Sequence, residues 1–218
     1  LISAASPVGE FEFLDLAGED LATPQTLSLY KDGLQEADLI IFLFDPLQLP
    51  EVRSLLAGTM AMPPSNAADP AIIWENLKEV IGPPESRKNP NQKVAVAISK
   101  FDAVTLAMQS GHFTFFETFD SAMAINRDPY ATNPNPPSPG AKRDFNTLDG
   151  GDVNSETKAL LRLIGLTVEA DLDKDPGGWP EQNVKYFVVS ALGQGIKGKT
   201  HGLSSFRIGD PIRWALAN

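Results

Sequence analysis

The sequence predicts an α/β fold, a doubly wound and mostly parallel sheet, and three observations support it. Four short apolar runs have the length of β-strands, and segments with helical spacing of apolar residues lie between them. The runs at 38–45 (DLIIFLFD) and 94–99 (VAVAIS) are apolar nearly throughout, which is typical of parallel strands covered on both faces. A chain of 218 residues is long enough to form one well-buried domain.

The predicted helices are located by their boundary signals. Thr23 precedes a proline and can cap a helix whose apolar side continues to Leu34. Asp69 also precedes a proline and opens a second helix, which Gly82 and two prolines end. In chain order we expect strand 11–15 (FEFLD), a helix from Pro24 to Leu34, strand 38–45, a helix from Pro70 to Val80, strand 94–99, a helix capped by Asn154 or Ser155, strand 184–190 (VKYFVVS) and a last helix from Asp210 to Leu216.

Two stretches interrupt this order and predict loops. Residues 57–66 are small and proline-rich, and residues 126–151 are dense in proline, asparagine and glycine. We therefore expect one domain over residues 1–218, with a helical and loop insertion at about 105–183.

Composition excludes several classes of partner. The net charge of −10 argues against a nucleic-acid surface or an anionic membrane surface, because both need an excess of Lys and Arg. No apolar run reaches the roughly 20 residues that a membrane span needs. The chain has no cysteine, so disulfides and thiolate metal sites are impossible, and a cytoplasmic location fits best.

The first chemically informative turn is 13–20 (FLDLAGED). Asp15 stands at the carboxyl end of a predicted strand, where open α/β sheets bind ligands, and could hold Mg²⁺ through water. Gly18 would let the backbone approach a terminal phosphate closely. An ordinary strand-to-helix turn has the same pattern, so this turn alone decides nothing.

The second turn, 99–102 (SKFD), directly follows the strand at 94–99. The Asp102 carboxylate could accept two hydrogen bonds from the ring N–H and amine of guanine, which adenine does not offer. Lys100 could lie across the base or brace the loop. The alternative is a solvated Lys-Asp pair after a strand, which is common.

The third turn, Ser190, Ala191, Leu192 and Gly193, follows the strand at 184–190. Its small residues would allow a backbone N–H to reach the carbonyl of a base. A tight turn without any function would look the same.

Together these turns resemble the DxxG, [NT]KxD and SA[KL] elements of Ras-like and translation-factor GTPases. FLDLAGED, SKFD and the closing DPIRWAL are similar to bacterial double-GTPase families of the same P-loop NTPase superfamily. The resemblance covers about residues 10–104 and 184–218. It implies a P-loop NTPase-like fold and a GTP-binding switch or slow GTPase, with GTP or GDP and Mg²⁺ as ligands.

Two residues depart from that family's pattern. Ser99 stands where the family has Asn or Thr, which weakens bracing of the guanine loop. Glu19 stands where Ras-like members carry the glutamine that positions water, and its charge would lie beside the γ-phosphate. Any hydrolysis that uses Glu19 should be slow without a partner, and we expect the insertion at 105–183 to bind a protein.

The phosphate-binding loop of the family, G-x-x-x-x-G-K-[ST], is missing before Asp15. The pattern occurs at 193–200, but glycines and a proline follow it instead of a helix, so we interpret it as a chance match. We expect the fold to be incomplete at its N-terminus and an upstream segment to carry the loop. Two alternatives stay open: an interaction module that has lost nucleotide binding, and a permuted NTPase that uses Lys199 and Thr200.

Overall fold

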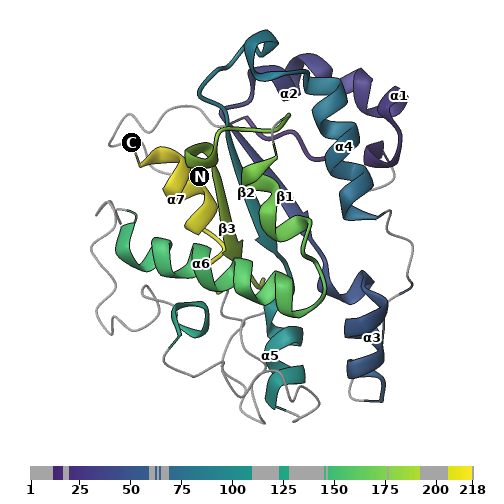
Figure 1. Cartoon of the computed structure of the whole chain (residues 1–218), viewed down its shortest axis with the longest axis vertical. Helices are drawn as coiled ribbons and strands as arrows, with labels where there is room; N and C mark the ends of the chain where they lie inside the picture. Colours follow the sequence, from purple (N-terminus) through teal and green to yellow (C-terminus); the bar gives the residue numbers. More distant parts are fainter. Residues whose placement is uncertain are drawn as a thin grey trace, which may run out of the picture.

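A three-stranded parallel sheet lies at the centre of the molecule (Figure 1). The computed structural model describes residues 12–16, 20–58, 62, 64, 69–109, 123–127, 145, 147–175, 177–191 and 206–217. The strand order is β1 (Leu39–Phe44), β2 (Lys93–Ile98) and β3 (Val184–Val188), with Leu39 opposite Lys93 and Val94 opposite Val184. This arrangement confirms the predicted α/β class and its parallel sheet.

Helices fill the connections between the strands. The α-helices are α1 (Pro24–Leu27), α2 (Lys31–Glu36), α3 (Pro50–Leu56), α4 (Pro70–Ile81), α5 (Phe101–Gln109), α6 (Thr147–Leu163) and α7 (Asp210–Leu216). The 3-10 helices are η1 (Asp20–Ala22), η2 (Ser28–Tyr30), η3 (Pro46–Gln48), η4 (Pro84–Ser86), η6 (Ala124–Asn126), η7 (Glu169–Lys174) and η8 (Glu181–Asn183). In Figure 1 the strands point toward α3 and α5, and α1 and α2 lie at the opposite end.

Local chemistry explains where the helices begin and end. The Thr23 hydroxyl accepts a hydrogen bond from the N–H of Thr26, and the Asp69 carboxylate accepts one from the N–H of Ala71 at 2.9 Å. Both caps satisfy N–H groups that have no partner inside the helix. Gly82 has φ = 84°, a left-handed conformation that suits glycine and ends α4. The predictions for these two helices are confirmed, with the first divided into α1, η2 and α2.

The two faces of the sheet are covered differently. The first face packs against α1, α2, α4 and α6 around a large core, in which Phe42 meets Trp74 edge to face. The second face has a smaller core, built where Trp214 of α7 covers Ala95 and Ala97 of β2 and Phe187 of β3. On this second face, the described residues cover β2, β3 and the start of β1 at Leu39.

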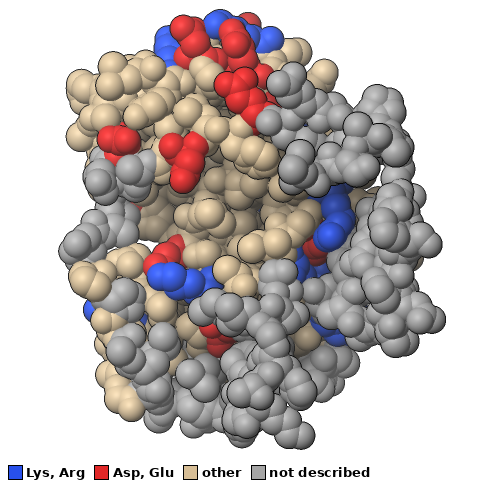
Figure 2. Space-filling model, turned by 180° about the vertical axis from the view of Figure 1, so that it is seen from behind, with Lys and Arg blue, Asp and Glu red and all other residues tan. Residues whose placement is uncertain are grey.

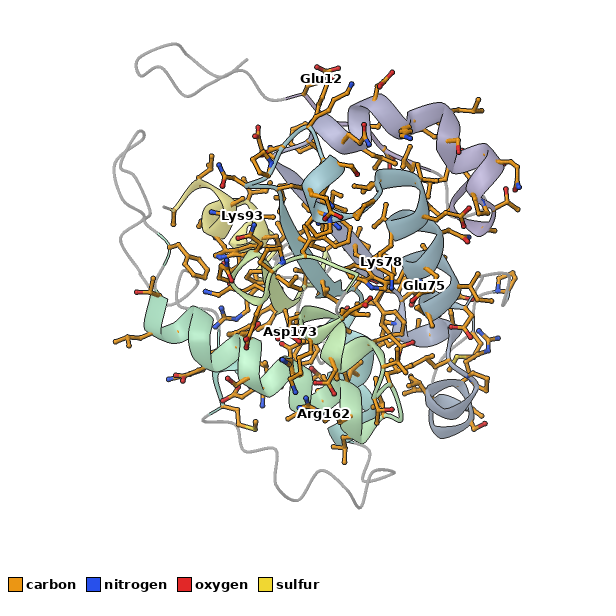
Figure 3. The ribbon with its side chains drawn as sticks, turned by 45° about the horizontal axis from the view of Figure 1, so that its top comes forward. Glu12, Glu75, Lys78, Lys93, Arg162 and Asp173 are labelled. Atoms are coloured by element: carbon orange, nitrogen blue, oxygen red, sulfur yellow. The ribbon has the colours of Figure 1, made fainter. Side chains whose placement is uncertain are left out.

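The predicted strand at 11–15 is wrong for its described residues. Residues 12–16 form no strand, and the Phe13 side chain is 74% exposed. Leu14 instead lies against Gly33 of α2, and Figure 3 shows Glu12 near the same helix. Its apolar run predicted a strand, but among the described residues no strand lies beside it to pair with.

Three further differences concern helices. The third predicted helix begins at Thr147, seven or eight residues before the expected cap at Asn154 or Ser155, so the predicted loop 126–151 is wrong at 147–151. Helices α3 and α5 were not predicted at all. Most of the predicted loops 57–66 and 126–151 lie outside the described residues.

The segment predicted as an insertion, 105–183, contributes to the main core. Ile125 of η6, Leu160 and Leu161 of α6, Leu172 of η7 and Trp179 are all buried in it. These residues pack on the first face of the sheet together with α4, so this part of the chain helps to build the fold.

Candidate functional site

The carboxyl ends of the strands bring two of the three predicted turns together. Phe101 begins α5 immediately after the β2 turn, and its N–H donates to the carbonyl of Val189 beyond β3 at 3.2 Å. The Ser190 hydroxyl donates to a carboxylate oxygen of Asp102 at 2.5 Å. Ser190 is buried and also exchanges two backbone hydrogen bonds with Phe206, whose ring stacks on Phe101. The turn after β3 is therefore held by its contacts with Phe101, Asp102 and Phe206.

Lys100 and Ser99 join β2 to the end of β1. Lys100 has φ = 50°, a left-handed conformation that is uncommon for a residue with a side chain. Its ammonium lies 2.7 Å from the Asp45 carboxylate, which also caps η3 by accepting from the N–H of Leu47. The hydroxyl and the N–H of Ser99 both donate to the carbonyl of Phe44. The polar groups of both turns thus bind protein groups that the fold brings close.

The other predicted site residues are not brought to this place. Asp15 is exposed within the segment beside α2, at the amino ends of the strands, whereas Asp102 lies beyond their carboxyl ends. Ala191 is exposed next to Ser190. Gly18, Glu19, Leu192 and the 193–200 segment lie outside the described residues. In the Ras-like arrangement all three turns lie at one edge of the sheet. Asp15 does not lie at the edge that Asp102 and Ser190 share, so this arrangement is not formed.

The predicted magnesium site lacks a set of ligands. Among the residues that the structure describes, no group of three or more His, Cys, Asp or Glu could hold a metal ion. Asp15 by itself offers one exposed carboxylate, whereas Mg²⁺ takes an octahedral set of oxygen ligands. Magnesium binding at Asp15 stays a prediction without a described partner residue.

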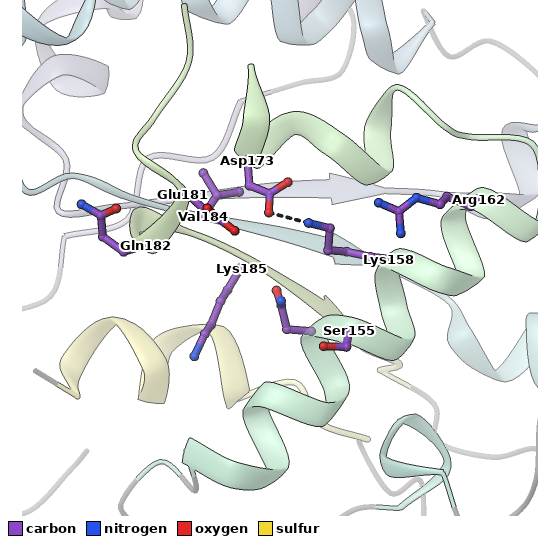
Figure 4. Close-up of a pocket in the computed structure, with 9 residues that line it drawn as sticks. Ser155, Lys158, Arg162, Asp173, Glu181, Gln182, Val184 and Lys185 are labelled. Carbon is purple, nitrogen blue, oxygen red and sulfur yellow. Dashed lines mark hydrogen bonds and ion pairs between the residues drawn. The ribbon is translucent and has the colours of Figure 1, made fainter. Parts of the chain in front are cut away.

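A polar pocket lies between α6 and the outer edge of β3 (Figure 4). It has a volume of about 410 Å³, and its charged groups are largely paired: Lys158 with buried Asp173 at 2.5 Å, and Arg162 with Asp171 at 2.7 Å. The Asn154 side chain closes this edge by accepting from the N–H of Tyr186 in β3. Burial, with the charge of Asp173 nearby, raises the pKa of Tyr186, so its phenol stays neutral.

A buried ion network surrounds Arg207 and was missed by the sequence analysis. Its guanidinium donates to the carboxylates of Asp149 and Asp210 and to the carbonyls of Ala124 and Arg127. These contacts tie α6, η6 and α7 together. The sequence carries no clear signal for this burial, because of the two apolar neighbours Phe206 is buried and Ile208 is 51% exposed.

Among the described residues, the outer edge of β1 is a free edge of the sheet. Within the described contacts, β1 pairs with β2 along one side and with no strand along the other. Ile41 and Leu43 alternate with the buried Phe42 and Phe44, and their side chains are 39% and 63% exposed. An exposed apolar edge strand is a template for pairing with another chain. Figure 2 shows an uncharged hollow in the middle of the rear face, with acidic residues on the surface above it.

One curated protein is similar to the chain along most of its length. The chain is 29% identical over 205 residues to SaeC of Mycolicibacterium smegmatis, a protein named for a proposed role in ESX-1 scaffolding and assembly. The match covers 92% of this chain and 49% of SaeC, so the chain spans about half the length of this relative. No family model matches the chain, and no solved structure matches it. No helix in the described part of the chain is long and apolar enough to cross a membrane.

These findings overturn the GTPase interpretation. The relative is named for scaffolding and assembly, and no P-loop GTPase family matches the chain. The membership of the P-loop NTPase superfamily and the function as a GTP-binding switch or slow GTPase are therefore wrong. The physical reason lies in the turns themselves: DxxG, SKFD and SALG are short, and strand ends in any parallel sheet can carry them. Here the polar groups of SKFD and of Ser190 serve to join β1, β2, β3 and α5.

Proposed function

We propose that this chain is a protein-binding module that takes part in the assembly of a larger complex. The observation that carries the proposal is the unpaired edge of β1, where Ile41 and Leu43 expose apolar side chains next to a well-packed core. Exposed apolar surface of this kind marks sites of protein association. The similarity to SaeC, whose name refers to scaffolding and assembly, supports the same conclusion.

The docking surface on β1 is not where the sequence analysis expected a protein partner to bind. The sequence pointed to residues 105–183, where most described apolar side chains lie in the core, although Leu148 and Val168 are exposed. We therefore place the docking surface on β1. Asp102 and Ser190 then have a supporting role, because their hydrogen bond fixes the carboxyl ends of β2 and β3, on which β1 packs. A cytoplasmic location stays our prediction.

The test uses one charge at the centre of the surface. Leu43→Asp places a carboxylate where a partner's apolar group would pack, and a central contact of this kind is expected to weaken binding by at least about tenfold. The measurement is quantitative affinity capture from the protein's own organism, with wild type, Leu43→Asp and Leu29→Asp as baits. Leu29 is an exposed leucine of η2 and provides the matched control.

The expected result is a set of captured proteins that wild type and Leu29→Asp share and that Leu43→Asp loses. Thermal melting should show that both variants stay folded, because both side chains are exposed. Capture of the same proteins in the same amounts by all three baits would contradict the proposal.

A further inference from the structure

We infer that the free edge of β1 binds an extended segment of a basic partner protein, which adds to the sheet as a further strand. This inference rests on the proposed function and goes beyond it by naming how the partner is held and what chemistry it carries. The backbone of β1, its exposed side chains and the charges at its start each support it independently.

The backbone groups of β1 divide between two sides. The carbonyls of Asp38 and Phe44 accept from the N–H groups of Lys93 and Ser99 at 2.9 and 2.7 Å, which fixes the side that faces β2. In a parallel strand the N–H and C=O of one residue point to the same side, and the side alternates along the chain. Leu39, Ile41 and Leu43 therefore direct their N–H and C=O groups away from β2.

Those outward groups match the needs of an incoming strand. Within the described part of the chain, no hydrogen bond involves these outward N–H and C=O groups. An extended peptide that pairs with a sheet edge gains its affinity from such main-chain groups, and alternate side chains give specificity. The edge of β1 offers three donors and three acceptors in the regular spacing that such a peptide requires.

The side chains of the same residues define what the partner brings. Leu39 packs at the border of the second-face core, and by alternation Ile41 and Leu43 point to that face beyond the cover of Trp214. A partner strand would place every second side chain beside them. Apolar residues at those alternate positions would extend the second core over β1.

Charge at the start of the edge favours a basic partner. Asp38 precedes β1, is exposed, and accepts a hydrogen bond from the neutral amide of Asn89. Glu36 and Asp32 lie on the adjoining helix α2 and share Lys88. The chain carries a net charge of −10, so a second copy would approach against repulsion, whereas Lys or Arg beside Asp38 would be attracted.

The experiment uses synthetic peptides and the whole chain. The probe is a fluorescent peptide of alternating valine and threonine flanked by lysines, and its binding is measured by fluorescence anisotropy. A glutamate-flanked analogue tests charge. Two further analogues carry N-methyl groups on one or the other set of alternate amides, which removes the donors on one side of the strand.

The proposal predicts a distinctive pattern. The lysine-flanked peptide should bind at least about tenfold more tightly than the glutamate-flanked one, and methylation of only one of the two amide sets should abolish binding. Ile41→Pro, which removes an outward donor without touching the ladder to β2, should weaken binding, while Ile41→Thr should preserve it. If Ile41→Pro does not fold, the two methylated peptides still decide the question.

Other results would overturn the inference in separable ways. Equal binding of both methylated peptides would show that apolar contact, without backbone pairing, holds the peptide. Equal binding of the glutamate-flanked peptide would remove the basic partner. Dimerisation that Ile41→Pro abolishes, without peptide binding, would identify a second copy as the occupant. Failure of all peptides while Leu43→Asp still loses its partners would end this inference and leave the proposed function intact.

Discussion

Glu169 is a carboxylic acid that the fold buries at the start of η7. Its side chain is almost inaccessible to water, and this burial raises the pKa of Glu169 above its ordinary value of 4.5, with the nearby charge of Asp69 adding to the effect. A raised pKa means that the folded state holds the proton more tightly than the unfolded state does. The stability that the protonated form contributes is therefore complete below the ordinary pKa and is lost as the pH rises through the raised one.

Glu169→Gln should accordingly stabilise the protein near neutral pH, because the amide keeps the shape of the side chain and carries no charge. For a chain of this size each kcal/mol gained raises the melting temperature by about 2–4 °C. The advantage should vanish below about pH 4, where wild-type Glu169 is protonated in both states. Thermal melting across pH measures this, with the exposed Glu181→Gln as control. A constant difference at every pH would refute the explanation.

At the scale of elements, Arg207 joins α6, η6 and α7 through one buried guanidinium. Breaking a buried ion pair by removal of one partner leaves the other charge buried and unpaired, which destabilises by about 3–5 kcal/mol. Arg207→Met should fall toward the lower end of this range, because Asp149 and Asp210 would lose their shared cation while Arg213 stays paired with Asp210. Arg162→Met removes an exposed pair with Asp171 and should cost about 0–1 kcal/mol. Urea unfolding measures both, and equal losses would contradict the assignment.

The sequence predicted elements whose signals are local and missed those that depend on distant partners. Asp69 and Gly82 bound α4 through groups within or next to the helix itself, so its limits were readable. The start of α6 was not, because Gly150 and Gly151 disfavour a helix, and the contact of Asp149 with Arg207 comes from a residue far along the chain. At residues 12–15 a strand was predicted and is not formed. An apolar run indicates a strand, but it does not show whether another strand lies beside it.

The same limit applies to the candidate site. The structure brings Ser190 and Asp102 together at the strand ends, because parallel strands bring their carboxyl ends to one edge. The free edge of β1 could not be inferred in this way. The run DLIIFLFD indicates a strand covered on both faces, and nothing in it reveals that Leu43 would stay exposed.

At the scale of the whole molecule, the two faces and the two edges of the sheet are covered to different extents. The first face of the sheet is closed by α1, α2, α4 and α6, and the outer edge of β3 is closed in part by the Asn154 side chain of α6. On the second face the cover of α7 reaches β2, β3 and the start of β1 at Leu39, and the described residues leave the outer edge of β1 unpaired. The described residues thus cover the edge of β3 in part and leave that of β1 unpaired, which supports the proposed pairing of β1 with a strand from outside.

Hydrogen exchange of the individual β1 amides, followed by NMR on the free protein, tests this central claim most directly. The N–H groups of Ile40, Phe42 and Phe44 face β2 and should be strongly protected, whereas those of Leu39, Ile41 and Leu43 should exchange nearly as fast as in an unfolded chain. Equal protection of all six amides would show that the outer edge is already paired, and the account of β1 as a docking edge would be wrong.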